Sequence, residues 1–120
     1  MLNLIEEVID EREGTVQLDR LMALLHIDKQ ELARTVGLSR DALSKSSRVS
    51  APKTQNRLRE QIEILNRILT WTGSLAGAFA WHRSQPIPSF ADKTAEELVK
   101  EGRATAVRNY LARINEGGCA

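Results

Sequence analysis

The chain carries the stretch Gln30-Glu31-Leu32-Ala33-Arg34-Thr35-Val36-Gly37-Leu38-Ser39-Arg40-Asp41-Ala42-Leu43-Ser44-Lys45, and this stretch decides its fold. Ala33 is small enough for a second helix to pack closely against the first, and Gly37 tolerates the positive φ of a tight turn. Leu43 is an aliphatic residue that can face back into a core. This spacing predicts a helix-turn-helix, in which two short helices cross steeply after a three- or four-residue turn. An ordinary helical hairpin with a glycine turn is the alternative interpretation.

The second helix of a helix-turn-helix lies in the major groove of DNA, where its first residues reach base edges. Arg40 is a candidate for bidentate contact with guanine, and Ser44 for contact with a base or a phosphate. The basic residues that follow are candidates for phosphate contacts, which position a protein without specifying a sequence. Asp41 argues mildly against this interpretation, because a carboxylate repels phosphate. The candidate DNA-binding residues are Ser39, Arg40, Asp41, Ser44, Lys45, Arg48 and Lys53.

The distribution of charge favours the same interpretation, although the net charge of the 120 residues is only +1. Residues 1–28 carry seven acids and two bases, a net charge of −5. Residues 29–67 carry nine bases and four acids, net +5, and residues 68–120 carry six bases and five acids, net +1. A basic middle segment is what a phosphate-contacting surface needs, although a solvated helical face is the simpler interpretation of charge alone.

Helix formers and hydrophobic residues at helical spacing dominate the chain, so we predict an all-α fold of about six to seven helices. Asp28 with Glu31, and Thr94 with Glu97, have the spacing of a capping box, and Ser39 is a third predicted N-cap. The predicted helices cover about residues 16–25, 29–36, 40–46, 52–71, 74–83, 94–100 and 103–114, with a short amphipathic helix before them that Gly14 ends and a polar loop at 46–54. We divide the chain into a helix-turn-helix domain, residues 1–71, and a small helical module, residues 72–120.

The predicted helix 52–71 has apolar residues on two sides, and such a helix must cover two surfaces. One stripe contains Leu58, Ile62, Leu65 and Leu69, and the other contains Ile64, Ile68 and Trp71. The next helix, 74–83, adds small and apolar residues. Together these surfaces exceed what a small helical core uses, so the sequence predicts a homodimer that would bind a palindromic DNA site.

The residue patterns that catalysis or metal binding requires are not found in the sequence. His26 and His82 are far apart, no Cys/His cluster has metal-ligand spacing, and there is no glycine-rich phosphate loop or nucleophile elbow. The single cysteine, Cys119, cannot form an internal disulfide, which is typical of a reducing cytoplasm. The first residues lack the pattern of a signal peptide, and no apolar run approaches the ~20 residues of a membrane span. We therefore expect a cytoplasmic protein that is not an enzyme, with no cofactor, metal or membrane partner.

The second half of the chain resembles the toxin-binding domain of the Xre/MbcA/ParS antitoxins. The resemblance rests on the runs Ala80-Trp81-His82-Arg83-Ser84-Gln85-Pro86-Ile87-Pro88, Lys93-Thr94-Ala95-Glu96-Glu97-Leu98-Val99, Glu101-Gly102-Arg103-Ala104 and Val107-Arg108-Asn109-Tyr110-Leu111-Ala112-Arg113-Ile114. The helix-turn-helix is similar to the Xre-like N-terminal part of the same proteins, so the resemblance covers about residues 16–118. The sequence departs from the family at Ala95, where proline is frequent, and at His82, where an aliphatic residue is common.

The resemblance implies a function and a partner. Such antitoxins are encoded beside a toxin, neutralise it by direct contact, form dimers and repress their own promoter. The usual toxin has a RES fold and destroys NAD, and the C-terminal part of the antitoxin blocks access to its pocket. Carried over to this chain, the implied toxin contacts are Trp81, Arg83, Arg103, Asn109, Arg113, Gly117, Gly118, Cys119 and Ala120. Core packing is the alternative role for Trp81.

Two other functions are compatible with the sequence. The protein could be a stand-alone dimeric helix-turn-helix transcriptional regulator whose C-terminal helices only dimerise. It could also be a structural adaptor with a degenerate helix-turn-helix. A toxin reading frame beside the gene would favour the antitoxin, and a gel shift with the protein's own promoter would separate the adaptor from the other two.

Overall fold

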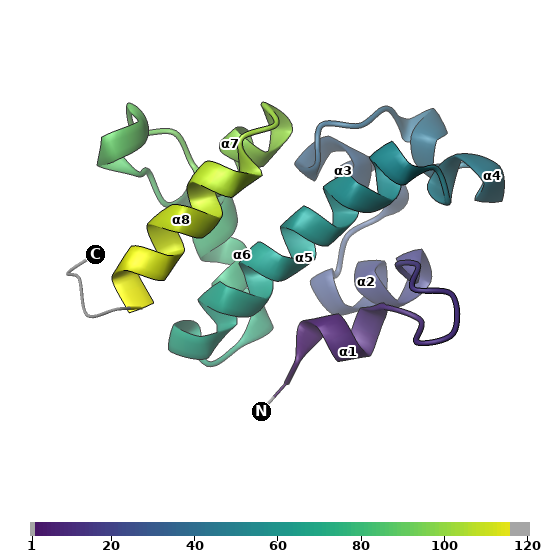
Figure 1. Ribbon diagram of the computed structural model, residues 1–120, viewed down its shortest axis with the longest axis horizontal. Coiled ribbons are helices and arrows are strands. Elements are labelled where there is room, and N and C mark those ends of the chain that lie inside the picture. Colours follow the sequence, from purple (N-terminus) through teal and green to yellow (C-terminus); the bar gives the residue numbers. More distant parts are fainter. Residues whose placement is uncertain (1, 116–120) are drawn as a thin grey trace.

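The elements of the chain are helices throughout the part described by the computed structural model, residues 2–115 (Figure 1). Their bounds are α1 (Leu4–Val8), α2 (Leu18–Leu25), α3 (Lys29–Thr35), the 3-10 helix η1 (Arg40–Leu43), α4 (Ser46–Val49), α5 (Pro52–Thr72), α6 (Leu75–Ser84), the 3-10 helix η2 (Pro88–Phe90), α7 (Ala95–Lys100) and α8 (Ala104–Asn115). Residues 2–115 contain no β-strand, only two isolated bridges, Ile9–Val16 and Ile87–Lys93. The predicted all-α fold is confirmed.

Helix α5 lies at the centre of the molecule because both of its apolar stripes are buried. In Figure 1 it crosses the middle, with α1 and α2 on one side and α7 and α8 on the other. Pro52 occupies its first turn, and Gly73, with a φ of 77°, ends it. The stripe residues buried along it are Leu58, Ile62, Ile64, Leu65, Ile68 and Leu69, none of them more than 3% exposed.

This burial removes part of the observation from which the sequence analysis predicted a dimer. Of the seven stripe residues, only Trp71 reaches solvent to a large extent, at 37% exposed. Helix α5 packs against α1, α6, α7 and α8 of the same chain, so its two apolar sides cover two layers of one core. Apolar excess on α5 therefore gives no reason to expect a second copy. On α6, Ala76 and Ala80 are exposed and Leu75, Phe79 and Trp81 are half-buried, so that part of the predicted surface is left, and the homodimer stays a prediction.

The first helix is shorter than the sequence predicted. Helix α1 ends before Ile9, whose backbone is extended and forms the bridge to Val16. Gly14 does not end the helix; it has a φ of 69° and lies in the turn between the two bridge residues. Backbone groups are satisfied there by the bridge, since the Gln17 amide donates to the Val8 carbonyl and the Asp10 amide donates to the Thr15 carbonyl. Helix α2 begins after the bridge, at Leu18.

The C-terminal helices begin and end close to their predicted positions. The Glu97 amide donates a 3.1 Å hydrogen bond to Thr94 Oγ1, and the Glu97 carboxylate accepts one from the Thr94 amide, so the capping box of α7 is confirmed. Gly102, with a φ of 80°, separates α7 from α8. Helix α8 packs on α5 and α7, and one cluster of buried side chains runs through both halves of the chain.

His82 is a buried polar residue on α6, at a position where the resemblance led us to expect an aliphatic residue. It is fully buried, and within residues 2–115 neither of its ring nitrogens has a hydrogen-bond partner. Burial lowers the pKa of His82 to about 3, and the positive charge of Arg83 acts in the same direction. The folded protein therefore holds this imidazole neutral, while the unfolded chain takes up a proton near the ordinary pKa of 6.5.

The variant H82L is expected to reduce the acid sensitivity of the fold. Because the folded pKa lies below the unfolded one, stability is lost as the pH falls from 6.5 towards 3, by about 2 kcal/mol at pH 5. Leucine cannot take up a proton in the unfolded chain, and it also removes the two ring nitrogens that have no hydrogen-bond partner in the folded protein. Urea unfolding at pH 7.5 and pH 5 measures the difference, with H26N, at an exposed histidine, as the control. Equal acid sensitivity in H82L and the wild-type protein would contradict this account.

Candidate nucleic-acid interface

The hinge between the two helices is built as the sequence predicted. Ala33 is 2% exposed and Leu43 is 1% exposed, so both face the core. Gly37 follows α3 with a φ of 70°, a backbone conformation that costs other residues about 1–2 kcal/mol. The Leu38 amide donates a 3.0 Å hydrogen bond to the Ala33 carbonyl and closes the turn. Leu43 therefore faces the core, and Arg40 and Asp41 on the other side of η1 face solvent.

A second constraint on the hinge comes from the C-terminal half of the chain. A Cβ atom on Gly37 would lie only 3.0 Å from Lys100 Cα, so the turn presses against the end of α7. Arg57 of α5 fixes this contact, because its Nη1 donates hydrogen bonds of 3.0–3.1 Å to the carbonyls of Val36, Val99 and Lys100. These carbonyls lie at the C-terminal ends of α3 and α7, where a positive charge is favourable. One arginine thus caps two helices.

The second helix is not the single helix over 40–46 that the sequence predicted. Instead η1 is a single 3-10 turn, and α4 begins separately after Lys45, whose backbone is extended. The Ser44 hydroxyl donates a 2.9 Å hydrogen bond to the Arg40 carbonyl. Serine side chains compete with the backbone in this way, which lowers their helix propensity and favours a break. The predicted loop 46–54 accordingly contains α4 and the start of α5.

Two predicted helix caps also differ from the prediction. Ser39 precedes η1, but its side chain makes no capping hydrogen bond within the described chain. Asp28 does cap α3, since its Oδ1 accepts a 2.8 Å hydrogen bond from the Glu31 amide. The carboxylate of Glu31 does not complete the capping box; it pairs with Arg34 at 2.9 Å and with Arg83 on α6. Helix α3 is tied to α6 as a result.

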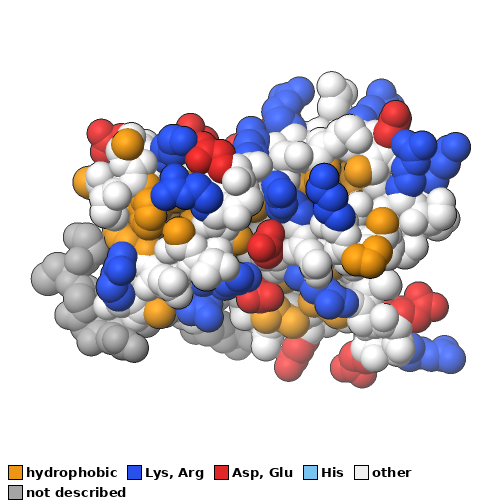
Figure 2. All heavy atoms as spheres, turned by 45° about the horizontal axis from the view of Figure 1, so that its top comes forward, with side chains coloured by type: hydrophobic (Ala, Val, Ile, Leu, Met, Phe, Trp, Pro, Cys, Tyr) orange, Lys and Arg blue, Asp and Glu red, His pale blue; other side chains and the backbone are white. Residues whose placement is uncertain are grey.

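The candidate DNA-binding side chains gather at one end of the molecule. Figure 2 shows Lys and Arg side chains over the right-hand end, where α4 and the start of α5 lie. Residues 40–53 contain four bases and one acid. All seven candidates, Ser39, Arg40, Asp41, Ser44, Lys45, Arg48 and Lys53, are exposed. Asp41 Oδ2 lies 3.9 Å from Arg48 Nη1, so the single acid of this surface forms an exposed ion pair with one of its four bases.

Gln55 of α5 holds α4 in position beneath this surface. Its Oε1 accepts a 2.9 Å hydrogen bond from the Val16 amide, and its Nε2 donates a 2.7 Å hydrogen bond to the Val49 carbonyl. The side chain is buried. Gln55 was not among the predicted site residues, although its spacing of three and seven residues from Leu58 and Ile62 places it on the buried face of the helix.

The residues that the resemblance assigns to toxin binding fall into three groups. Arg103, Asn109 and Arg113 are exposed on or just before α8. Trp81 is half-buried on α6 and packs edge-to-face on Trp71, with ring centres 5.2 Å apart. Arg83 is engaged within the chain, as described next. The remaining four, Gly117, Gly118, Cys119 and Ala120, lie outside the described residues.

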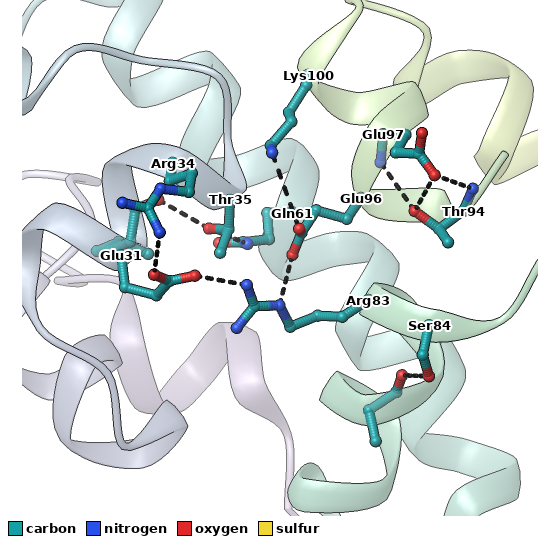
Figure 3. A network of polar contacts seen from close by, with 12 residues as sticks. Glu31, Arg34, Thr35, Gln61, Arg83, Ser84, Thr94, Glu96, Glu97 and Lys100 are labelled. Atoms are coloured by element: carbon teal, nitrogen blue, oxygen red, sulfur yellow. Dashed lines mark hydrogen bonds and ion pairs between the residues drawn. The ribbon is translucent and has the colours of Figure 1, made fainter.

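Arg83 belongs to a polar network that joins α3, α6 and α7 (Figure 3). It pairs with Glu31 on one side and with Glu96 on the other, where Nε lies 2.9 Å from Oε1. Glu96 is 8% exposed, and its burial raises its pKa even though Arg83 and, at 4.0 Å, Lys100 act against that shift. Beside this network, Gln61 Nε2 donates a 2.8 Å hydrogen bond to Thr35. Ion pairs therefore join α3 to α6 and α7, and a hydrogen bond joins α3 to α5.

No family model, curated protein or solved structure matches this chain. Within residues 2–115, no helix is long and apolar enough to cross a membrane. No group of three or more His, Cys, Asp or Glu residues in the same part of the chain is arranged to hold a metal ion.

Proposed function

We propose that the protein is an antitoxin of the Xre/MbcA/ParS type that binds DNA through the surface formed by η1, α4 and the first turn of α5. One observation carries the DNA-binding part of this proposal. Ala33, Val36 and Leu43 are buried at the hinge, whereas all seven candidate DNA-binding side chains are exposed beside it. A basic exposed surface supported by a buried helical hinge is what a phosphate-contacting module requires.

The short second helix affects how DNA would be bound. A 3-10 helix rises about 2.0 Å per residue, so the four residues of η1 span only about 8 Å. Such a short element brings few side chains to base edges, and Arg40 at its start is the main candidate to read one. Lys45, Arg48 and Lys53 then contact phosphates. Affinity in this arrangement is mostly electrostatic and falls steeply with salt concentration.

The second part of the proposal concerns the partners. By resemblance, the residues from Trp81 onward bind and neutralise a cognate toxin of the RES type in the cytoplasm. Exposed side chains on α8 support a protein-binding role, because Arg103, Asn109 and Arg113 do not belong to the core. A homodimer would place two hinges on half-sites about one or two helical turns of DNA apart. Binding at its own promoter would repress the operon.

A stand-alone transcriptional regulator is the second candidate function, and one observation favours it. Arg57 caps α3 and α7 together, and Arg83 joins α3 to α7 through Glu31 and Glu96. The C-terminal helices thereby stabilise the hinge directly. Helices α7 and α8 would therefore contribute to the stability of the DNA-binding half even in a protein that binds no toxin.

Co-expression with the adjacent reading frame and a gel shift with the upstream promoter distinguish the candidates. Rescue of growth together with a promoter shift is expected for the antitoxin. A shift without rescue would favour the stand-alone regulator, and absence of both would overturn the two proposals. The double variant R103E/R113E is expected to lose rescue and retain the shift. The matched control R12E/R67E, with the same change in charge at exposed arginines, is expected to retain both.

The variant D41N is expected to bind promoter DNA about fivefold more tightly than the wild-type protein. Asparagine removes a repulsive charge and releases Arg48 from its 3.9 Å pair, which leaves one more cation for phosphate. The slope of log affinity against log salt should steepen by about one. Fluorescence anisotropy at several salt concentrations measures both quantities, with E11Q as the control at an exposed acid. Unchanged or weaker binding would show that Asp41 does not face the DNA.

A further inference from the structure

A groove at the opposite end of the molecule from η1 and α4 has no role in the proposed DNA contact. It has a volume of about 310 Å³ and is lined by Trp81, Gln85, Pro86, Pro88 and Tyr110. The lining residues come from the end of α6, the segment before α7, and α8. Figure 2 shows hydrophobic side chains on the α8 side of the molecule, bordered by Lys and Arg side chains.

Tyr110, which lines the groove, belongs to a row of two aromatic rings with an arginine at each end. Tyr110 packs edge-to-face on Phe90, with ring centres 6.2 Å apart. The Arg103 guanidinium lies 5.4 Å from the Phe90 ring centre, and that of Arg113 lies 6.0 Å from the Tyr110 ring centre. Both arginines keep exposed side chains. The charged residues of α8 and its N-terminal end are Arg103, Arg108 and Arg113, all of them basic. Arg108 lies 3.5 Å from Glu63 of α5, and Arg103 lies 3.7 Å from the exposed carboxylate of Glu101.

The backbone along the groove offers no strand-pairing edge. Pro86 and Pro88 have no amide proton. The Gln85 amide already donates to the Trp81 carbonyl at 3.0 Å, and the Ile87 amide donates to the Lys93 carbonyl at 3.0 Å. An occupant must therefore be recognised by aromatic side chains and arginines, not by addition of a β-strand.

We propose that this groove binds an acidic segment of a partner protein. An apolar side chain of that segment packs against Trp81 and Tyr110, and flanking carboxylates pair with Arg103 and Arg113. Charge complementarity selects this occupant, because guanidinium groups favour carboxylates. The Arg113 guanidinium lies over the Tyr110 ring that lines the groove, and that of Arg103 lies at the far end of the same aromatic row. A single-stranded nucleic acid fits less well, since these two arginines already lie over rings on which bases would stack. The inference deepens the partner-binding part of the proposed function and rests on it.

Selection from a random 12-residue peptide library displayed on phage tests this inference with the full chain. The peptides enriched on the wild-type protein are expected to contain an excess of Asp and Glu around an aromatic or aliphatic residue. Synthetic versions are expected to bind R103E/R113E at least tenfold more weakly than the wild-type protein. The control R12E/R67E should bind them as the wild-type protein does. In the variant W71F, Trp81 is the single tryptophan left, and its fluorescence is expected to change on binding.

Three outcomes of the peptide experiments would overturn the inference. They are a failure to enrich peptides, enrichment of basic or neutral peptides, and equal loss of affinity in the control. An oligothymidylate that binds more tightly than the selected peptides, and is lost in R103E/R113E, would assign the groove to nucleic acid instead. Thermal melts of all variants establish that each is folded. Acidic peptides bound without rescue of a toxin would sustain the groove assignment and remove the antitoxin proposal, so the two failures are distinguishable.

Discussion

A variant carrying both R40Q and K45Q is expected to bind promoter DNA about 100-fold more weakly than the wild-type protein. Arg40 is the candidate for a base contact, and loss of a bidentate contact with guanine costs about 1–3 kcal/mol. Lys45 is exposed beside it and contributes one phosphate contact. Together the two losses correspond to about 2.7 kcal/mol, or two decades of affinity. The salt slope should fall by about one to two.

Fluorescence anisotropy with a labelled promoter duplex measures this loss. The control R12Q/R67Q removes two exposed positive charges away from the surface formed by η1 and α4, so it tests whether net charge alone explains the effect. An unchanged affinity in R40Q/K45Q, or an equal loss in the control, would show that this surface does not contact DNA.

The variant R57M is expected to lower the free energy of unfolding by about 3 kcal/mol. Methionine keeps most of the side-chain volume but removes the Arg57 donor from the carbonyls of Val36, Val99 and Lys100. The Val99 carbonyl still accepts a 3.0 Å hydrogen bond from the Gly102 amide. Hydrogen bonds from a charged donor contribute about 1.5–3 kcal/mol each. The Arg57 side chain is 19% exposed, so water can bond to the carbonyls in part. The loss of stability is therefore expected to stay well below the sum of three separate hydrogen bonds.

Chemical denaturation with urea measures the stability of R57M. The conservative variant R57K is expected to lose less, because an ammonium group still favours the C-terminal ends of two helices. R67M, at an exposed arginine on the same helix, serves as the control and should change stability by less than about 0.5 kcal/mol. A loss in R57M no larger than in R67M would mean that Arg57 does not join α3 to α7.

Local spacing was sufficient to predict the hinge and most of the helices. Ala33 and Leu43 are buried and Gly37 has a positive φ, as predicted, although the predicted second helix is a single 3-10 turn followed by α4. The capping box of Thr94 and Glu97 is likewise a signal contained within four residues of sequence. Such features could be predicted because the interactions that decide them lie within one or two turns.

Features that depend on distant contacts could not be predicted in the same way. The break at Ser44 and Lys45 depends on a side-chain hydrogen bond competing with the helix, and propensity alone did not place it. The early end of α1 depends on a bridge that forms only once the chain turns back. Arg57 was counted as one basic residue among nine, yet its partners lie 21, 42 and 43 residues away in sequence.

The same limit applies to the candidate sites. Exposure of the DNA-binding candidates followed from the register of the hinge, so it was predictable from Ala33 and Leu43. For Arg83 the sequence offered a surface role, but its guanidinium pairs with Glu31 and Glu96 inside the chain. The apolar stripes of α5 are covered by other helices of the same chain, a fact that only the packing of α1, α6, α7 and α8 decides.

A titration followed by amide ¹H–¹⁵N NMR spectra tests the central claim most directly. Unlabelled duplex DNA from the promoter would be added to the labelled full chain at low salt. The largest changes in amide position are expected between residues 38 and 53, with smaller ones at the end of α3. Changes confined to α6, α7 and α8, or no change at a DNA concentration that saturates a gel shift, would contradict the assignment of η1 and α4 as the DNA-binding surface.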